Sequence, residues 1–355
     1  MDGDSPSESL NEQPCQDASE LGEQEEPAAL SEGIWPSSEA GKRECIRRTS
    51  TIGSCSSSGD DPSTLDMSKI PAQLQIPYEH LQIQGFLGRG QFGEVRKADI
   101  VSTDYLTKPK KEEVAVKVLK DTASAKDSSD FIKEVQNMIE LESKQRCLYI
   151  IKLRGVSKNP SGKLMLVTEL APLGALDKYL PKNTEILRTP QLLDFCMQIC
   201  KGMRYLENQS LLHKDLAARN ILVMREDLVK ISDFGLSRLQ DYYKLQDSSK
   251  VPIKWYALES LLKQRFTTKS DVWSFGVTMW EIFSYGQHKP YSEIESQELP
   301  RFLEDGKRLS CPQQCPPKVY DVMYNCWLKD ATKRPSFFLL ETTYLETLQE
   351  EYNSS

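Results

Sequence analysis

The 355-residue sequence contains no apolar run approaching the ~18 residues that a membrane-spanning helix needs. Its first residues, Met1-Asp2-Gly3-Asp4, lack the basic and apolar regions of a secretory signal. They also lack the glycine at position 2 that N-myristoylation requires. These absences predict a cytoplasmic protein without a transmembrane segment, in a compartment that keeps thiols reduced.

Acidic residues outnumber basic ones, and histidine is rare. The sequence has 45 Lys and Arg against 52 Asp and Glu, which gives a formal net charge of −7 and argues against non-specific nucleic-acid binding. It has only three His, and the close pairs Cys196/Cys200 and Cys311/Cys315 have too few neighbouring ligands for a zinc site. We interpret the nine Cys as ordinary buried or loop thiols.

The composition and the apolar pattern of the sequence change near Ile76. Residues 1–75 are rich in Ser, Glu, Asp, Gly and Pro and poor in periodic apolar residues, so they are predicted to be disordered. Residues 76–169 read as short strands around one helix, and residues 174–350 are mainly helical, with a short tail at 351–355. This pattern predicts an α+β chain with a small strand-rich N-lobe and a larger helical C-lobe. No SH2 pattern, SH3 pattern or internal repeat is present.

The most informative motif is His213-Lys214-Asp215-Leu216-Ala217-Ala218-Arg219-Asn220, followed shortly by Asp233-Phe234-Gly235. It places a candidate catalytic base, Asp215, close to two candidate magnesium ligands, Asn220 and Asp233. Phosphoryl transfer from ATP needs these three groups, because the base orients a hydroxyl while the metal ligands hold ions that neutralise the phosphates. His213 is interpreted as structural, packed against Phe234.

Two upstream motifs fit the same chemistry. Gly88-Arg89-Gly90-Gln91-Phe92-Gly93 is followed by a strand instead of a helix, which favours a hairpin over phosphates and argues against a dinucleotide-binding unit. Lys117 stands in the apolar strand Val114-Ala115-Val116-Lys117. Glu134 lies on a predicted amphipathic helix with Phe131, Val135, Met138 and Ile139 on one face, so it can pair with Lys117 and hold the ammonium on the ATP phosphates.

These motifs together resemble the protein kinases, over roughly residues 78–350. Leu216-Ala217-Ala218-Arg219-Asn220 and Pro252-Ile253-Lys254-Trp255 resemble the tyrosine kinases. Tyr242-Tyr243-Lys244 and Trp255-Tyr256-Ala257 are similar to the cytoplasmic Syk branch, and Thr168-Glu169-Leu170-Ala171-Pro172-Leu173-Gly174 is similar to the Ack branch. The resemblance implies the two-lobed kinase fold. It also implies a non-receptor tyrosine kinase that uses ATP and Mg²⁺ to phosphorylate tyrosines of proteins in intracellular signalling.

The resemblance also implies roles for individual residues. Asp215, Lys117, Arg219 and Asn220 are candidate catalytic residues, with Arg219 orienting the substrate tyrosine. The nucleotide would contact residues from the glycine turn, the first strands and the inter-lobe junction: Leu87, Gly88, Arg89, Gly90, Gln91, Phe92, Gly93, Val95, Ala115, Lys117, Glu134, Thr168, Glu169, Ala171 and Leu222. Met138, Leu153, His213 and Phe234 would form an apolar column between the lobes.

A regulatory segment is predicted between Asp233 and Glu259. Tyr242 and Tyr243 are candidate autophosphorylation sites, with Arg238 and Lys214 as partners of the phosphate and SH2-bearing proteins as possible readers. Lys214 replaces the usual Arg of this loop, and Leu258 replaces the Pro of an Ala-Pro-Glu motif whose Glu259 remains and can pair with Arg334. Two alternatives stay open, a pseudokinase scaffold and a serine/threonine or dual-specificity kinase.

Overall fold

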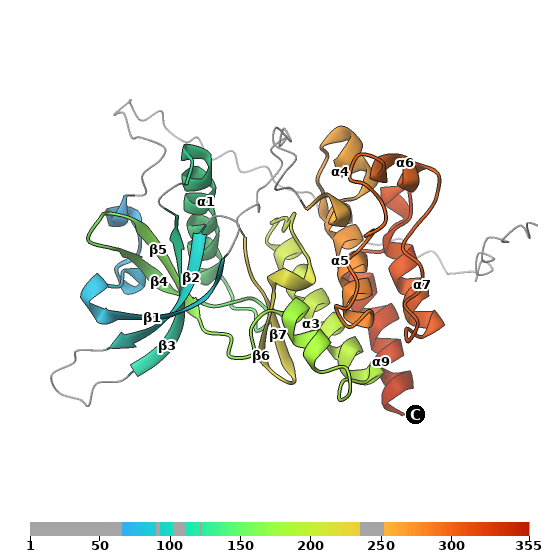
Figure 1. Ribbon diagram of the computed structural model, residues 1–355, viewed down its shortest axis with the longest axis horizontal. Helices are drawn as coiled ribbons and strands as arrows, with labels where there is room; N and C mark the ends of the chain where they lie inside the picture. Colours follow the sequence, from blue (N-terminus) through green and yellow to red (C-terminus); the bar gives the residue numbers. More distant parts are fainter. Residues whose placement is uncertain (1–65, 90–92, 102–110, 121–122, 235–251, 355) are drawn as a thin grey trace, which may run out of the picture. The chain divides into compact units, whose positions relative to one another are not determined.

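The computed structural model describes residues 66–89, 93–101, 111–120, 123–234 and 252–354. Five antiparallel strands form the first sheet: β1 (Leu81–Arg89), β2 (Gly93–Val101), β3 (Lys111–Leu119), β4 (Leu153–Lys158) and β5 (Leu164–Glu169). Their spatial order is β1-β2-β3-β5-β4 (Figure 1). Because side chains alternate along a strand, Val114 and Val116 of β3 enter the core beneath the sheet, whereas Ala115 and Lys117 face the opposite side.

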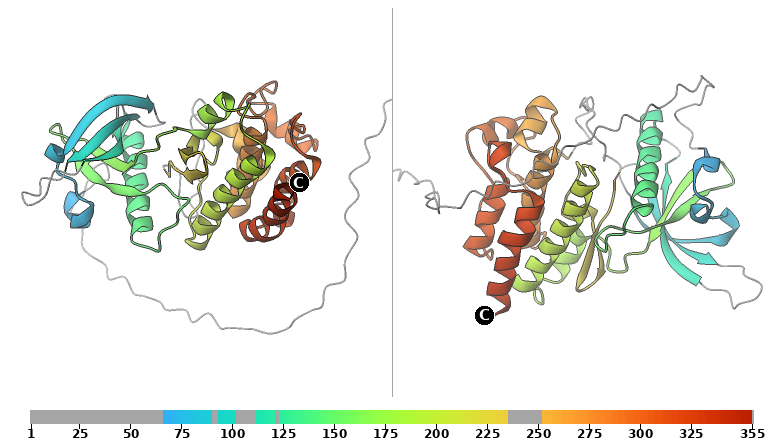
Figure 2. Two further views of the ribbon diagram at one scale, coloured as in Figure 1. Left: turned by 90° about the horizontal axis from the view of Figure 1, so that it is seen from below. Right: turned by 180° about the vertical axis from the view of Figure 1, so that it is seen from behind.

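One long helix, α1 (Ala125–Glu142), lies against this sheet (Figure 1, Figure 2). The helix begins at a capping box, in which Ser124 and Asp127 each bond the backbone N–H of the other, at 3.1 and 2.9 Å. Its apolar face buries Phe131, Val135 and Met138, as the helical spacing predicts. The same face carries Glu134, which is therefore also buried.

Helices dominate the remainder of the described chain. They are α2 (Leu176–Tyr179), α3 (Thr189–Asn208), α4 (Leu258–Lys263), α5 (Thr268–Phe283), α6 (Leu299–Glu304), α7 (Pro317–Cys326), α8 (Phe337–Leu339) and α9 (Glu346–Asn353), with a two-stranded sheet of β6 (Ile221–Arg225) and β7 (Leu228–Ile231). Every residue of α5 from Ser270 to Phe283 is buried, so this helix is the centre of the C-terminal part, as its apolar sequence predicts. The α+β, two-lobed fold class is confirmed.

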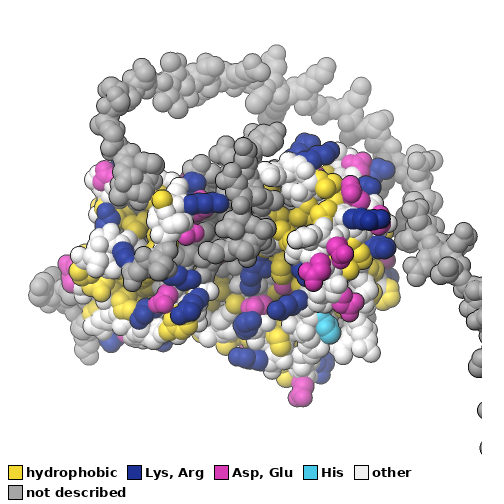
Figure 3. Space-filling view, turned by 45° about the horizontal axis from the view of Figure 1, so that its top comes forward, with side chains coloured by type: hydrophobic (Ala, Val, Ile, Leu, Met, Phe, Trp, Pro, Cys, Tyr) yellow, Lys and Arg dark blue, Asp and Glu magenta, His cyan; other side chains and the backbone are white. Residues whose placement is uncertain are grey.

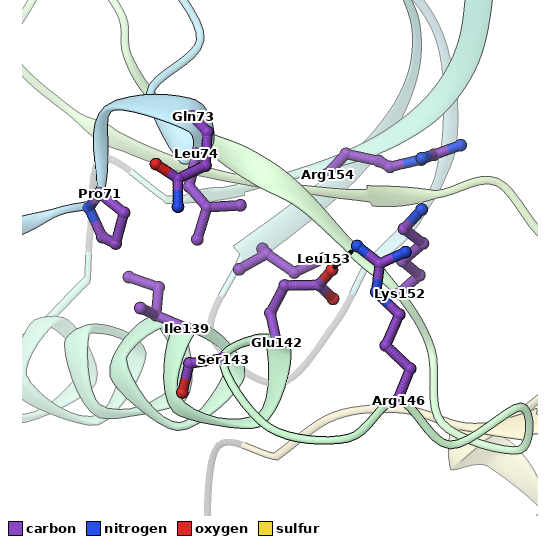
Figure 4. A pocket seen from close by; sticks show the side chains of 10 residues that line it. All are labelled: Pro71, Gln73, Leu74, Ile139, Glu142, Ser143, Arg146, Lys152, Leu153 and Arg154. Atoms are coloured by element: carbon purple, nitrogen blue, oxygen red, sulfur yellow. Dashed lines mark ion pairs between the residues drawn. The ribbon is translucent and has the colours of Figure 1, made fainter.

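The N-terminal boundary predicted at Ile76 cuts through a packed segment. Residues 66–75 contain two short 3₁₀ turns, Met67–Lys69 and Ala72–Leu74, and bury Ile70 and Leu74. The Ile76 N–H donates to the Val156 carbonyl of β4 at 2.8 Å. In Figure 4, Leu74 faces Ile139 and Leu153 across a cavity of about 370 Å³ beside the end of α1. The prediction of disorder for residues 1–65 lies outside the described residues.

The C-terminal boundary also moves, because α9 continues to Asn353 and does not stop at residue 350. Lys318 of α7 pairs with Glu351 of α9 at 2.7 Å, which ties the last helical turn to the domain. The segment predicted as a tail is therefore part of a helix up to Asn353.

Candidate active site

Three charged side chains from separate elements meet in one cluster, Lys117 on β3, Glu134 on α1 and Asp233 after β7. The Lys117 Nζ lies 2.7 Å from both Glu134 carboxylate oxygens and 3.3 Å from Asp233 Oδ1. Burial alone would lower the pKa of Lys117, but Asp233 and Glu134 outweigh it and raise the pKa above its usual value. The ammonium therefore stays charged and is fixed in position by carboxylates from both lobes.

Asp215 lies in the loop between α3 and β6, beside a one-turn 3₁₀ helix, Ala218–Asn220. The Asn220 Nδ2 donates to the Asp215 carbonyl at 2.7 Å and to Oδ2 at 2.9 Å, and Arg219 pairs with Oδ1. Burial raises the pKa of Asp215 to about 6, although Arg219 and the Asn220 bond act in the opposite direction. A carboxylate with this pKa is ionised at neutral pH and still basic enough to accept a hydroxyl proton.

His213 is buried and packs against Phe234, with ring centroids 5.5 Å apart. Its Nε2 lies 3.1 Å from the Ser232 carbonyl, and burial lowers its pKa, so the ring is neutral. The structural interpretation of His213 is confirmed by this packing. Met138 and Leu153, the other predicted members of the column, are also buried.

The donor set around Asp233 fits a magnesium ion that completes its shell with phosphate and water. Among the described residues, no group of three or more His, Cys, Asp and Glu side chains gathers as a self-sufficient metal site. Asn220 uses its amide nitrogen on Asp215, and its amide oxygen would be the atom that could bind a cation. Mg²⁺ commonly takes only one or two protein ligands in phosphate-binding sites, so Asn220 and Asp233 would be enough to hold one.

The predicted nucleotide residues that the structure describes lie mainly on the strands of the first sheet. Ala115 of β3 is paired with Thr168 of β5, and Lys117 is paired with Val95 of β2. Leu87, Gly88 and Arg89 end β1, Gly93 begins β2, and Leu222 lies in β6, while Gly90, Gln91 and Phe92 lie outside the described residues. A Cβ added to Gly93 would collide with the Val118 carbonyl oxygen, so the close approach of β2 to β3 requires glycine there.

Glu169 and Ala171 follow at the junction between the lobes. The Glu169 side chain accepts the Lys152 N–H at 2.7 Å and the Lys230 ammonium at 2.6 Å. Because the Glu169 side chain is engaged within the protein, the predicted contact with the nucleotide would use the backbone of this residue. The contacts of Glu169 and Ala171 with the nucleotide stay a prediction.

The sequence profile described as protein tyrosine and serine/threonine kinase matches residues 81–343. The chain belongs to this family. It is 40% identical over 286 residues to tyrosine-protein kinase ZAP-70 of Mus musculus, covering 79% of this chain and 44% of that protein. It is 41% identical over 263 residues to tyrosine-protein kinase SYK of Gallus gallus, covering 73% and 41%.

A receptor kinase is also among the relatives. The chain is 42% identical over 270 residues to receptor tyrosine-protein kinase erbB-2 of Mesocricetus auratus, covering 75% of this chain and 21% of that protein. The chain thus carries a protein tyrosine kinase domain and spans less than half the length of these relatives. No helix within the described ranges is long and apolar enough to span a bilayer.

Two substitutions in the kinase domain are accommodated locally. Lys214 is buried in a left-handed backbone conformation (φ 64°), with its Nζ 5.8 Å from the centre of the Phe266 ring. Leu258 begins α4 and is buried, and the neighbouring Glu259 forms the predicted ion pair with Arg334 at 2.6 and 2.8 Å. The pairing is confirmed. The regulatory candidates Arg238, Tyr242 and Tyr243 lie outside the described residues.

Two carboxylates on α5 that the sequence interpretation did not single out hold the catalytic loop. Asp271 accepts the backbone N–H groups of His213 and Lys214, each at 2.9 Å. Glu281 Oε2 accepts the Ala218 N–H and the Trp255 indole N–H, each at 2.9 Å. Their signal in the sequence is a pair of acidic residues on a helix that is otherwise apolar on all sides, because buried carboxylates require donors.

The surface also carries many charged side chains, in addition to the buried carboxylates. On the face seen in Figure 3, acidic and basic side chains of the described residues are interspersed. At the site, Arg219 pairs with Asp215, and its guanidinium carbon lies 4.4 Å from the centre of the Trp255 ring.

Proposed function

We propose that this kinase domain is catalytically active and transfers the γ-phosphoryl group of ATP to tyrosine hydroxyls of proteins. The observation that carries the proposal is the joint placement of Lys117, Glu134 and Asp233 in one cluster. Asp215 is held separately by Arg219 and Asn220. A pseudokinase scaffold would not need this full set of charged groups.

Each residue has a role that follows from its contacts. Lys117, fixed by Glu134, would contact the ATP phosphates, and Asp215 would orient the tyrosine hydroxyl and accept its proton. Asn220 and Asp233 would hold Mg²⁺, whose chemistry in such sites is neutralisation of phosphate charge. Transfer itself depends on positioning and charge stabilisation, because the phosphoryl group needs little covalent help from the protein.

The acceptor is proposed to be tyrosine because the platform beside Asp215 is large and aromatic. Trp255 stacks on Arg219, which in turn reaches the Asp215 carboxylate.

We also propose that the chain acts as a non-receptor enzyme in the cytoplasm. Tyr242 and Tyr243 are proposed to be autophosphorylated and bound by SH2-bearing proteins. The absence of a long apolar run from the sequence supports the cytoplasmic assignment.

Phosphoamino-acid analysis tests the proposal. The purified chain is incubated with labelled ATP and Mg²⁺, with and without a chelator, beside Asp215→Asn and the exposed control Asp227→Asn. We expect phosphotyrosine from the wild type and the control, and none with Asp215→Asn or the chelator. Phosphoserine or phosphothreonine would favour the dual-specificity alternative, and no transfer from the wild type would favour the scaffold.

A further inference from the structure

A continuous series of contacts leads from the core helix α5 to the candidate base. Glu281 is 8% exposed, and its Oε2 accepts both the Ala218 N–H and the Trp255 indole N–H. Ala218 begins the one-turn helix that contains Arg219, and Trp255 ends another, Ile253–Trp255. One carboxylate oxygen therefore joins two loop segments that are distant in sequence.

The far end of these contacts is Arg219. Its guanidinium lies 4.4 Å from the centre of the Trp255 ring and pairs with Asp215 Oδ1. About a third of the Arg219 side chain is exposed, so contact with Trp255 limits the positions that it can otherwise adopt. α5 also holds the Trp255 backbone, because Ser274 Oγ donates to its carbonyl at 2.8 Å.

We propose that Glu281 is a positioning residue for phosphoryl transfer, which fixes Arg219 through Ala218 and Trp255 and thereby sets the orientation of the Asp215 carboxylate. This inference rests on the proposed tyrosine kinase activity. Glu281 touches neither substrate nor reacting atoms. Its effect on transfer passes through Arg219, which stacks on Trp255 and pairs with Asp215.

The charges around these groups define what a change at Glu281 should do. Asp215 faces Arg219, which lowers its pKa, and Asp233, which raises it. Glu281 faces Arg219 and, from α2, Asp177. If Arg219 moves away, Asp215 loses its nearest cation and the contact that orients its Oδ1. The base is then misplaced relative to the tyrosine hydroxyl, so the loss falls on phosphoryl transfer.

The experiment compares Glu281→Ala with Glu281→Gln, whose amide oxygen can still accept both N–H groups. Glu281→Ala should lower kcat/KM for a tyrosine peptide by roughly 10- to 100-fold, because small misplacement of catalytic groups has effects of this size. It should also shift the side-chain ¹H–¹⁵N NMR signal of Arg219, which reports its ion pair and its contact with Trp255, while ATP-analogue affinity stays unchanged. Glu281→Gln should restore most of the activity and the original Arg219 signal.

Two further variants separate positioning from folding. Trp255→Phe keeps a ring but removes the N–H, and combined with Glu281→Ala it should add little further loss. Thr278→Val, also buried on α5, removes only a bond to the Ser274 carbonyl and should lower stability without moving the Arg219 signal.

The outcomes distinguish this inference from the proposed function. An unchanged Arg219 signal in Glu281→Ala, or loss of stability alone, would overturn the positioning role. A wild-type chain that phosphorylates no tyrosine would overturn the proposed function. Because the NMR measurement needs no turnover, it would decide the Glu281 contact in either case.

Discussion

Lys117 and Asp215, the candidate phosphate ligand and the candidate base, are held in place by different kinds of contact. Lys117 is fixed by side-chain ion pairs to Glu134 and Asp233, which come from a helix and a loop outside its own sheet. The loop that carries Asp215 is fixed through its backbone, by carboxylates of the buried helix α5. The first arrangement exists only while α1 is in position, whereas the second is part of the core.

This difference shows how one site can be both adjustable and precise. Ion pairs between separate elements can form and break as the elements move, because each partner is a flexible side chain. Carboxylates that accept buried backbone N–H groups leave unsatisfied donors if they are lost, so they rigidify the loop. We therefore expect changes in the Lys117 cluster to affect turnover most, and changes at Asp271 to affect stability most.

Loss of charge in the Lys117 cluster should have the largest effect. Lys117→Met and Asp233→Asn should each nearly abolish transfer, because electrostatic contacts of this kind contribute roughly 3–4 kcal/mol to catalysis. Steady-state kinetics with a tyrosine peptide measure the loss. Lys111→Met, on the same strand but largely exposed, is the control and should retain activity. Autophosphorylation that persists in Lys117→Met would remove this residue from the site.

Removal of the Asp271 carboxylate should lower the free energy of unfolding. Asp271→Ala leaves the His213 and Lys214 N–H groups buried without their acceptor, at a cost of about 1–3 kcal/mol for each. Urea denaturation measures the change. Asp227→Ala, in the exposed β6–β7 turn, should change stability by no more than about 0.5 kcal/mol. Equal stability of the two variants would show that α5 does not hold the loop.

The pH dependence of kcat/KM should report Asp215. Burial raises its pKa to about 6, so the active, deprotonated form is lost as pH falls through about 6. At about pH 7 and above, deprotonation is nearly complete. Initial rates with a peptide whose own groups do not titrate in this range measure the acidic limb of the pH profile. A flat profile between about pH 5 and 7 would contradict a base of this pKa.

The smallest effect concerns regulation. Lys214 offers a point charge where an Arg would offer a bidentate fork, so Lys214→Arg should raise the activity of the form phosphorylated at Tyr242 and Tyr243. The unphosphorylated form should be nearly unchanged. Replacement of both tyrosines by Phe should lower activity. Steady-state kinetics of Lys214→Arg are measured on the phosphorylated and unphosphorylated forms. An equal change of activity in both forms would show that Lys214 does not contact the phosphotyrosine.

The sequence predicted the parts of the site whose partners lie in recognisable patterns. The strand around Lys117 and the helix around Glu134 have clear periodicity, and their ion pair is present in the structure. Asp271 and Glu281 are marked in the sequence only as acidic residues on a largely apolar helix. The backbone N–H groups that they accept lie more than fifty positions away, so no local pattern identifies these partners.

The error in the N-terminal boundary predicted at Ile76 has a similar cause. Ile70 and Leu74 are isolated apolar residues in a polar segment, so no period marks them. They are buried only because α1 and β4 provide a surface for them. A contact of this kind depends on the assembled fold, and composition alone indicated a tail.

The most direct test is whether the Lys117 cluster and Asp215 act as one catalytic unit. Initial rates of phosphotyrosine formation are measured for the wild type, Lys117→Met, Asp215→Asn and the double variant under identical ATP and Mg²⁺. The account predicts that the double variant is no slower than the slower single variant, because residues that act together are not additive. Wild-type rates in either single variant, or losses that multiply in the double variant, would contradict it.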